Sequence, residues 1–169
     1  PGARPADPVA YVITNLVADV ISIADAVDAE HFHLIGHDWG SAVGWSTVMR
    51  HPDRILSWTG LSIAHPTAFS EALQTDADQQ ARSQYFTLFT APYLPETLFT
   101  VNDLMVLMGM YGNMLDEQKA EYYAVFSEPG ALSSALNWYR MMSTSLAADS
   151  GSPEINTPTL FIWGNNDPS

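Results

Sequence analysis

The sequence has no cysteine, few basic residues and no long apolar run. Without cysteine it can form neither disulfides nor thiolate metal sites. Its 6 basic residues include one lysine, Lys119, and they face 19 acidic residues. The resulting formal charge of -13 argues against nucleic acid and anionic membrane surfaces as partners. No run of about 18 apolar residues occurs, so no membrane span is expected. Because the lack of cysteine suits a reducing compartment, we expect a cytoplasmic location.

The sequence does contain enough apolar material for a core. Of its 169 residues, 47% are hydrophobic, which suits one domain of ordinary size. It begins with PGARPADP rather than with a methionine, and it ends with GNNDPS directly after a strand-like segment. We therefore expect an internal fragment of a longer protein.

The first third of the sequence predicts two strands joined by a helix. Before them, apolar residues recur at the spacing of one helix face from Ile13 to Val27. FHLIG, residues 32–36, predicts a short buried strand, and a helical pattern follows over 41–51 until Pro52 ends it. RILSWTGLSI, residues 54–63, predicts the second strand. Strand, helix and strand with short connections are typical of a parallel sheet.

The pattern then becomes entirely helical. From about Pro66 to Gly151 we find only helical periods, separated by proline, glycine, asparagine and aspartate. A strand returns at 159–163, followed by a polar turn. The sequence thus predicts three parts: an α/β core over 1–65, a helical insert over 66–152, and a return to the core over 153–169.

The pentapeptide GHDWG, residues 36–40, stands where the first strand meets the next helix. Glycines at Gly36 and Gly40 relieve the crowding of so sharp a turn, and the residue at its apex, Asp38, is held in a strained, outward-pointing conformation. Backbone N–H groups at the start of the helix favour negative charge there. An ionised carboxylate in this place can attack an electrophilic carbon. The alternative is that Asp38 simply caps the helix.

GHDWGSAVGW, residues 36–45, resembles the nucleophile elbow of the α/β-hydrolase superfamily. The resemblance is to the branch with an aspartate nucleophile, which contains epoxide hydrolases and haloalkane dehalogenases. Residues 51–69 are similar to the next strand and the start of the cap, and TPTLFIWGNND, residues 157–167, is similar to the strand that carries the triad acid. The fold class that this implies is α/β: a partial α/β-hydrolase fold, with a parallel sheet, flanking helices and an all-helical cap insert.

Two tyrosines are singled out by the same resemblance. Epoxide hydrolases of this fold protonate the epoxide oxygen with two cap tyrosines. ALNWYR, residues 135–140, resembles one of the segments that carry them and points to Tyr139, and QYFTLF, residues 84–89, is similar to the other and points to Tyr85. Helical spacing alone would place both rings in a packed interface. The competing tyrosines are Tyr93, Tyr111, Tyr122 and Tyr123.

The resemblance also assigns the remaining roles. Asp167 becomes the carboxylate that orients the catalytic histidine, with an ordinary turn aspartate as the alternative. The backbone N–H of Trp39 becomes an oxyanion-hole donor, and His37 and Trp138 become possible pocket residues. No metal or organic cofactor is implied.

The catalytic histidine is missing from the sequence. Its five histidines are His31, His33, His37, His51 and His65. On this fold the chain order is nucleophile, acid, histidine, so the base is expected after Asp167. The second oxyanion donor is expected in a loop upstream of residue 1.

The resemblance implies an epoxide hydrolase that opens a small apolar epoxide with water to a vicinal diol, through an ester on Asp38. Two alternatives stay open: a haloalkane dehalogenase with the same nucleophile, and a non-catalytic ligand receptor on the same fold. The isolated fragment is expected to be inactive. It is also expected to aggregate, because its three strands would leave two bare sheet edges and an uncovered sheet face.

Overall fold

The computed structural model describes residues 2–149 and 154–167 and divides into two compact units. The sheet unit comprises residues 11–83 and 142–169, and the helical unit comprises residues 1–10 and 84–141. Each unit has its own apolar core, and each is described by itself.

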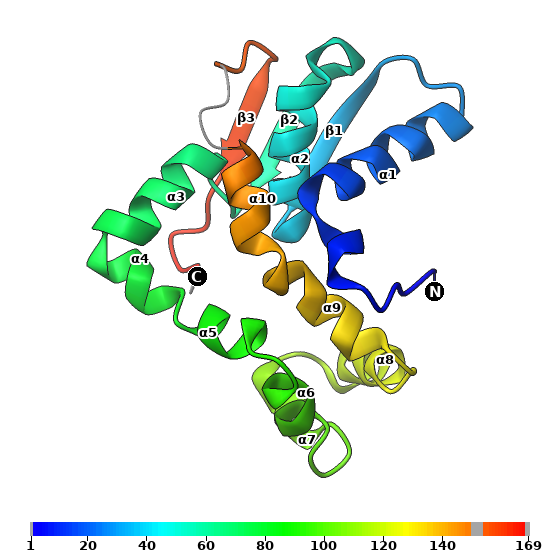
Figure 1. Ribbon diagram of the computed structural model, residues 1–169, viewed down its shortest axis with the longest axis vertical. Helices are drawn as coiled ribbons and strands as arrows, with labels where there is room; N and C mark the ends of the chain where they lie inside the picture. The colour runs from blue at the N-terminus through cyan, green and yellow to red at the C-terminus, as the bar shows by residue number, and fades with distance from the viewer. Residues whose placement is uncertain (1, 150–153, 168–169) are drawn as a thin grey trace. The chain divides into compact units, whose positions relative to one another are not determined.

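The sheet unit is built on three parallel strands in the order β1-β2-β3. These are β1 (Phe32–His37), β2 (Ile55–Leu61) and β3 (Thr159–Ile162), and the helix α2 (Trp39–Arg50) connects the first two (Figure 1). In register, His37 pairs with Leu61 and Leu61 pairs with Ile162, so the three strands end side by side. The predicted strand–helix–strand unit is confirmed.

Further helices complete this unit and lead into it. They are η1 (Pro8–Tyr11), α1 (Ile13–Ala26), η2 (Pro52–Arg54), α3 (Pro66–Thr75), α4 (Ala77–Arg82) and α10 (Met142–Asp149). The predicted apolar face of α1 is buried at Ile13, Leu16, Val17 and Ala24. The prediction is wrong at Val27, which follows the last helical residue and is 71% exposed.

The core between α2 and the sheet is centred on Trp58, whose side chain is fully buried. It packs with Trp45, Val48 and Ile55. A β-carbon added at Gly44 would lie 2.0 Å from the Trp58 ring, so this glycine lets α2 approach the sheet closely. The Trp45 indole N–H donates to the carbonyl of Ile63 at 2.8 Å and fixes the chain that leaves β2.

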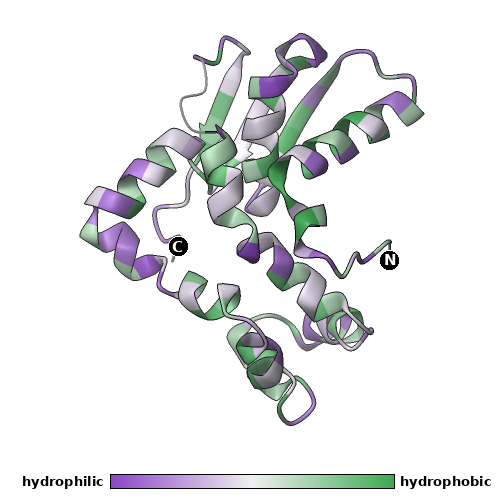
Figure 2. Cartoon of the chain, viewed as in Figure 1, coloured by the Kyte–Doolittle hydropathy of each residue, from purple (hydrophilic) through white to green (hydrophobic). Residues whose placement is uncertain are grey.

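The opposite face of the sheet is exposed. Side chains alternate across a strand, so Ile35 and Leu160 point away from α2, and they are 72% and 56% exposed. In Figure 2, hydrophobic and hydrophilic residues both occur along β1. The prediction of a buried strand is therefore wrong at Ile35, since α2 packs on one face of β1 and β2.

The helical unit contains the middle of the chain. Its helices are α5 (Tyr85–Thr90), α6 (Leu94–Phe99), α7 (Met105–Met110), α8 (Asp116–Phe126) and α9 (Ala131–Arg140). Their core consists of Phe99, Leu104, Leu107, Leu132 and Leu136. Between β2 and β3 the described residues form helices and their connections without a strand, as predicted for the insert.

The predicted domain limits stay a prediction. The compact units group α3, α4 and α10 with the sheet, although the predicted insert begins at residue 66. The other predicted limit, at 152/153, lies outside the described residues.

The helix α10 is fixed to the sheet unit by a buried carboxylate. The Asp149 side chain is 4% exposed and pairs with Arg50 at 2.5 Å, and it accepts a hydrogen bond from the Ser46 hydroxyl at 3.2 Å. Because both partners belong to α2, the chain returns from the helical unit to a defined place. Within the part of the chain that is described, no helix has the length and apolar character needed to cross a membrane.

Candidate active site

Asp38 stands at the apex of a sharp turn between β1 and α2. Its φ of 53° and ψ of -127° are values that a non-glycine residue adopts only under strain. The carbonyl of Asp38 accepts the first helical hydrogen bonds, from the N–H groups of Ser41 at 2.8 Å and Ala42 at 3.1 Å. Its side chain makes no capping hydrogen bond, and the residue is exposed. Asp38 thus occupies the N-cap position of α2, but its side chain does not cap the helix.

The two glycines of the turn differ in what surrounds them. A β-carbon at Gly36 would lie 2.3 Å from the carbonyl oxygen of Gly40, which is backbone and cannot give way. A β-carbon at Gly40 would meet nothing within 4 Å. The expectation that both glycines relieve crowding is right for Gly36 and wrong for Gly40, because it is the backbone of Gly40 that presses on Gly36.

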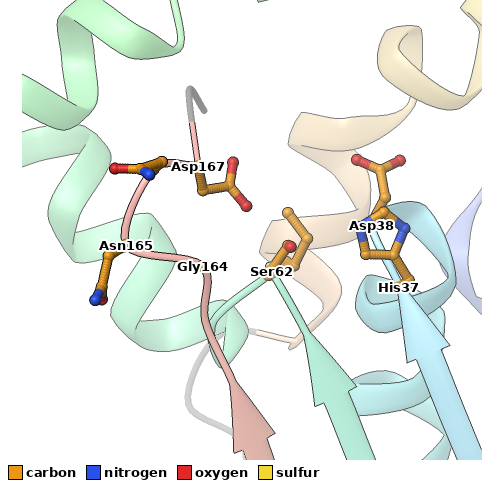
Figure 3. Close-up of a pocket in the computed structure, with 8 residues that line it drawn as sticks. His37, Asp38, Ser62, Gly164, Asn165 and Asp167 are labelled. Atoms are coloured by element: carbon orange, nitrogen blue, oxygen red, sulfur yellow. The ribbon is translucent and has the colours of Figure 1, made fainter. Parts of the chain in front are cut away.

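A hollow of about 490 Å³ lies at the carboxyl ends of the three strands (Figure 3). It is lined by His37, Asp38, Ser62, Ile63, Gly164, Asn165, Asn166 and Asp167. In Figure 3 the side chain of Asp167 points towards the strand ends that carry Ser62 and Asp38, whereas Asn165 points away. This is the end of a parallel sheet at which α/β proteins bind their ligands. The structure thus brings together two predicted residues, Asp38 and Asp167, that are far apart in sequence.

The loop that carries Asp167 is held by contacts that could not be predicted from the sequence. The Asp167 N–H donates to the carbonyl of Gly164 at 2.9 Å. Its carbonyl accepts from the guanidinium of Arg82, on α4, at 3.0 Å. Arg82 also donates a hydrogen bond to Asp78, which raises the pKa of Arg82. The group that bonds the Asp167 carbonyl is therefore a charged guanidinium. No motif marks Arg82, which lies 85 residues before Asp167.

Ser62 lines the hollow and was not predicted from the sequence. It directly follows β2, and its φ of 66° is left-handed. Its N–H donates to the carbonyl of Ile162 at 3.1 Å, which ties the ends of β2 and β3 together. Glycine and asparagine are the usual markers of this left-handed conformation. Because residue 62 is a serine, the sequence did not indicate it. Within the described residues, no three histidine, aspartate or glutamate side chains gather to hold a metal ion.

The two predicted tyrosines meet inside the helical unit. Tyr85 begins α5 and Tyr139 lies near the end of α9, and their ring centroids are 6.1 Å apart at an interplanar angle of 76°. Phe89 packs edge-on against Tyr139 at 4.8 Å. Trp138 is a half-buried neighbour of Tyr139 on α9.

The competing tyrosines are placed differently. Tyr111 and Tyr122 stack on each other with centroids 4.7 Å apart. The hydroxyl of Tyr123 donates to Asp103 at 2.7 Å, and this hydrogen bond raises the pKa of Tyr123. Tyr93 is 83% exposed. Tyr85 and Tyr139 share an aromatic cluster with Phe86 and Phe89, whereas Tyr111 and Tyr122 form a stacked pair of their own.

His65 has a structural place in the sheet unit. Its Nδ1 accepts a hydrogen bond from the N–H of Thr67 at 3.2 Å and so caps α3. Its ring lies 5.4 Å from that of Trp45. Burial lowers the pKa of His65, and the charge of Asp149 opposes this more weakly.

The position of His65 predicts a pH dependence of stability. The unfolded chain binds a proton to this histidine near its ordinary pKa of 6.5, whereas the folded protein binds it less readily. The free energy of unfolding should therefore be highest above pH 6.5 and fall as the pH drops towards the folded pKa. His65→Asn keeps an acceptor for the Thr67 N–H but does not titrate. In urea melts of the full-length protein between pH 8 and pH 5, it should lose less stability than the wild type, and equal losses would contradict the assignment.

Comparison with known proteins places the chain in a family. Residues 2–169 match the alpha/beta hydrolase fold family, and the chain belongs to this family. Among curated relatives, it is 33% identical to human Epoxide hydrolase 4 over 168 residues, which are 93% of this chain and 46% of that protein. It is 29% identical to Epoxide hydrolase 2 of Caenorhabditis elegans, covering 97% of this chain and 49% of the relative. The chain thus spans about half the length of the curated relatives it matches.

Solved structures agree on the fold. An epoxide hydrolase of Bacillus megaterium in complex with an inhibitor superposes with a TM-score of 0.78 at 26% identity, covering 98% of this chain and 63% of that one. A putative acyltransferase from Salmonella enterica superposes with a TM-score of 0.81 at 24% identity, covering 98% and 58%. The second likeness concerns the fold alone, since one fold serves many activities.

Proposed function

We propose that this chain supplies the nucleophile, the triad acid and the two proton donors of an epoxide hydrolase, which converts a small apolar epoxide and water into a vicinal diol. The observation that carries the proposal is the geometry of Asp38. Its backbone is strained, its side chain does not cap α2, and it lines the same hollow as Asp167. Its support in the comparisons is the likeness to relatives that are named epoxide hydrolases.

The first step opens the ring. A carboxylate oxygen of Asp38 attacks one ring carbon from the side opposite the epoxide oxygen, and that carbon–oxygen bond breaks. The released electron pair goes to the epoxide oxygen, which takes a proton from the hydroxyl of Tyr85 or Tyr139. The products are a hydroxyalkyl ester on Asp38 and a tyrosinate.

The second step hydrolyses the ester. Water attacks the ester carbonyl while a histidine, expected outside this sequence and oriented by Asp167, removes its proton. The backbone N–H of Trp39, the first residue of α2, stabilises the oxyanion; such a donor typically contributes about 3 kcal/mol. When the oxyanion collapses, the departing alkoxide takes the proton held by the histidine and leaves as the diol. The carboxyl proton of Asp38 passes to the tyrosinate, so Asp38 is regenerated as a carboxylate and the tyrosine as a phenol.

Two phenols distinguish this proposal from the dehalogenase alternative. A halide leaves as a stable anion and needs only N–H donors around it, whereas the alkoxide of an opened epoxide is a strong base and needs an acid. The adjacent rings of Tyr85 and Tyr139 supply two such acids from one cluster. This observation favours the epoxide as substrate.

The tyrosines provide the test of that choice. Tyr139→Phe and Tyr85→Phe should each lower kcat/KM for an epoxide such as styrene oxide, and together they should lower it by about 10² to 10⁴-fold, the usual contribution of general acids. Each phenylalanine keeps the ring contacts, so the fold should be unaffected. Tyr93→Phe, on a ring that is 83% exposed, is the matched control and should be neutral. If the double variant turns over styrene oxide at the wild-type rate, or if the wild type prefers a haloalkane of similar size, the proposal fails.

A further inference from the structure

Arg140 joins three elements of the helical unit. It is the last residue of α9, and its side chain is 17% exposed. Its Nη2 donates to the carbonyl oxygen of Ala91 at 3.1 Å and to the carboxylate of Glu96 at 2.8 Å. Its Nη1 donates to Oδ1 of the buried Asn137 at 3.0 Å. One guanidinium therefore bonds α9 to the end of α5 and to α6.

These contacts involve the two helices that carry the tyrosines. Tyr139 directly precedes Arg140, and Ala91 directly follows α5, the helix that begins with Tyr85. The Tyr139 ring also packs on Phe89 of the same α5. The separation of the two phenols depends on how α5 lies against α9, and Arg140 is the charged link between these helices.

The link is stronger than an ordinary surface ion pair. Glu96 is only 23% exposed, and Nη2 of Arg140 donates to two acceptors on different elements. The fork geometry lets Nη1 bond Asn137 at the same time, and the single ammonium of a lysine cannot reproduce both sets of contacts. Loss of the link should therefore shift α5 relative to α9 rather than unfold the unit, because the apolar core of Phe99, Leu104, Leu107, Leu132 and Leu136 remains.

We infer that Arg140 is a positioning residue, which holds Tyr85 and Tyr139 in the mutual geometry needed to protonate one epoxide oxygen. The inference rests on the proposed function. In the proposed mechanism the phenols act when the ring opens and not when the ester is hydrolysed. Arg140 should therefore affect the formation of the ester on Asp38 and leave its breakdown unchanged.

Single-turnover kinetics of the full-length protein test this. Excess enzyme is mixed rapidly with styrene oxide, the reaction is quenched at intervals, and the adduct on Asp38 is quantified by mass spectrometry. Arg140→Gln should slow adduct formation by about 10- to 100-fold, the cost of misplacing a catalytic group by about 1 Å. The rate of adduct decay should stay at the wild-type value. Arg140→Lys keeps the charge without the fork and should recover part of the lost rate.

The chain offers a matched control. Arg54 donates to the carboxylate of Asp25 at 2.6 Å and to the carbonyls of Ala29 at 3.0 Å and Glu30 at 2.6 Å. The cluster is similar, but it lies in the sheet unit and touches no proposed catalytic residue. Arg54→Gln should leave adduct formation unchanged. Glu96→Gln removes the negative charge of the link but keeps an acceptor oxygen, so it should slow adduct formation in the same way as Arg140→Gln, although less.

The outcomes separate the inference from the proposed function. If Arg140 acts through the phenols, Arg140→Gln should add little to the defect of a Tyr85→Phe/Tyr139→Phe background. Wild-type adduct formation in both Arg140→Gln and Glu96→Gln, with slow formation in Tyr139→Phe, would overturn the inference and leave the proposed function standing. Fast formation in the double tyrosine variant would overturn the proposed function itself. If Arg140→Gln does not fold, Arg140→Lys and Glu96→Gln decide by the same criterion.

Discussion

Replacing Asp38 with glycine is expected to abolish epoxide turnover and at the same time to stabilise the fold. The φ of 53° and ψ of -127° at this position are strained for aspartate and relaxed for glycine. Relief of such strain is typically worth about 1 to 3 kcal/mol, although the flexibility of glycine in the unfolded chain offsets part of it. Without the nucleophile, kcat should fall by about 10⁴-fold or more. A variant that gains stability and loses activity would indicate that the backbone strain at Asp38 serves catalysis.

Urea melts and steady-state assays of the full-length protein measure both effects. The matched control is Asp28→Gly, because Asp28 is an exposed aspartate with a similar φ of 55° in the turn after α1. It should stabilise the protein without changing turnover. A destabilised Asp38→Gly variant would contradict the account of the turn, and an active one would contradict the account of the nucleophile.

Gly36→Ala is expected to have the largest effect on stability. The added methyl group would lie 2.3 Å from the carbonyl oxygen and 2.6 Å from the carbonyl carbon of Gly40. Since these are backbone atoms, the strand end and the start of α2 must separate. We expect a loss of about 3 kcal/mol or more in the free energy of unfolding, the upper end of the usual cost of overpacking. Turnover should be lost as well, because Asp38 lies on the displaced segment.

Gly40→Ala is the control for this prediction, in the same turn and with the same added methyl group. It would meet nothing within 4 Å and lies in the first turn of α2. Alanine is the better helix former, so this variant should be as stable as the wild type or more stable, by up to about 1 kcal/mol. The free energy of unfolding of both variants is measured by urea denaturation. Comparable losses of stability would contradict the claim that only Gly36 is crowded in this turn.

The turn at Asp38 could be predicted from sequence because its determinants are local. A short apolar strand, two glycines and a helical pattern occupy adjacent positions, so the geometry follows from a few residues. The same reasoning failed at Val27, where no glycine or proline marks the end of α1 and the apolar period continues past the last helical residue. It also failed for Ile35, because an apolar strand looks the same whether one face is covered or both.

The support around the site could not be predicted, because it depends on contacts between distant residues. Arg82 and Asp167 are 85 positions apart, and Arg140 and Glu96 are 44 apart. Neither pair belongs to a periodic pattern. Each depends on how distant elements of one unit pack together, and the order of residue types along the chain does not reveal that packing. The family resemblance located Tyr85 and Tyr139, but nothing in their spacing announced that their rings would be neighbours.

The source of the oxygen in the product tests the central claim most directly. Excess full-length enzyme is allowed one turnover of styrene oxide in water labelled with ¹⁸O, and both the diol and the peptide that contains Asp38 are weighed by mass spectrometry. If water attacks an ester carbonyl, the label enters the carboxylate of Asp38, and the new oxygen of the diol comes unlabelled from the protein. Label in the diol with none in Asp38 would show that water attacks the epoxide itself and would contradict the covalent role of Asp38.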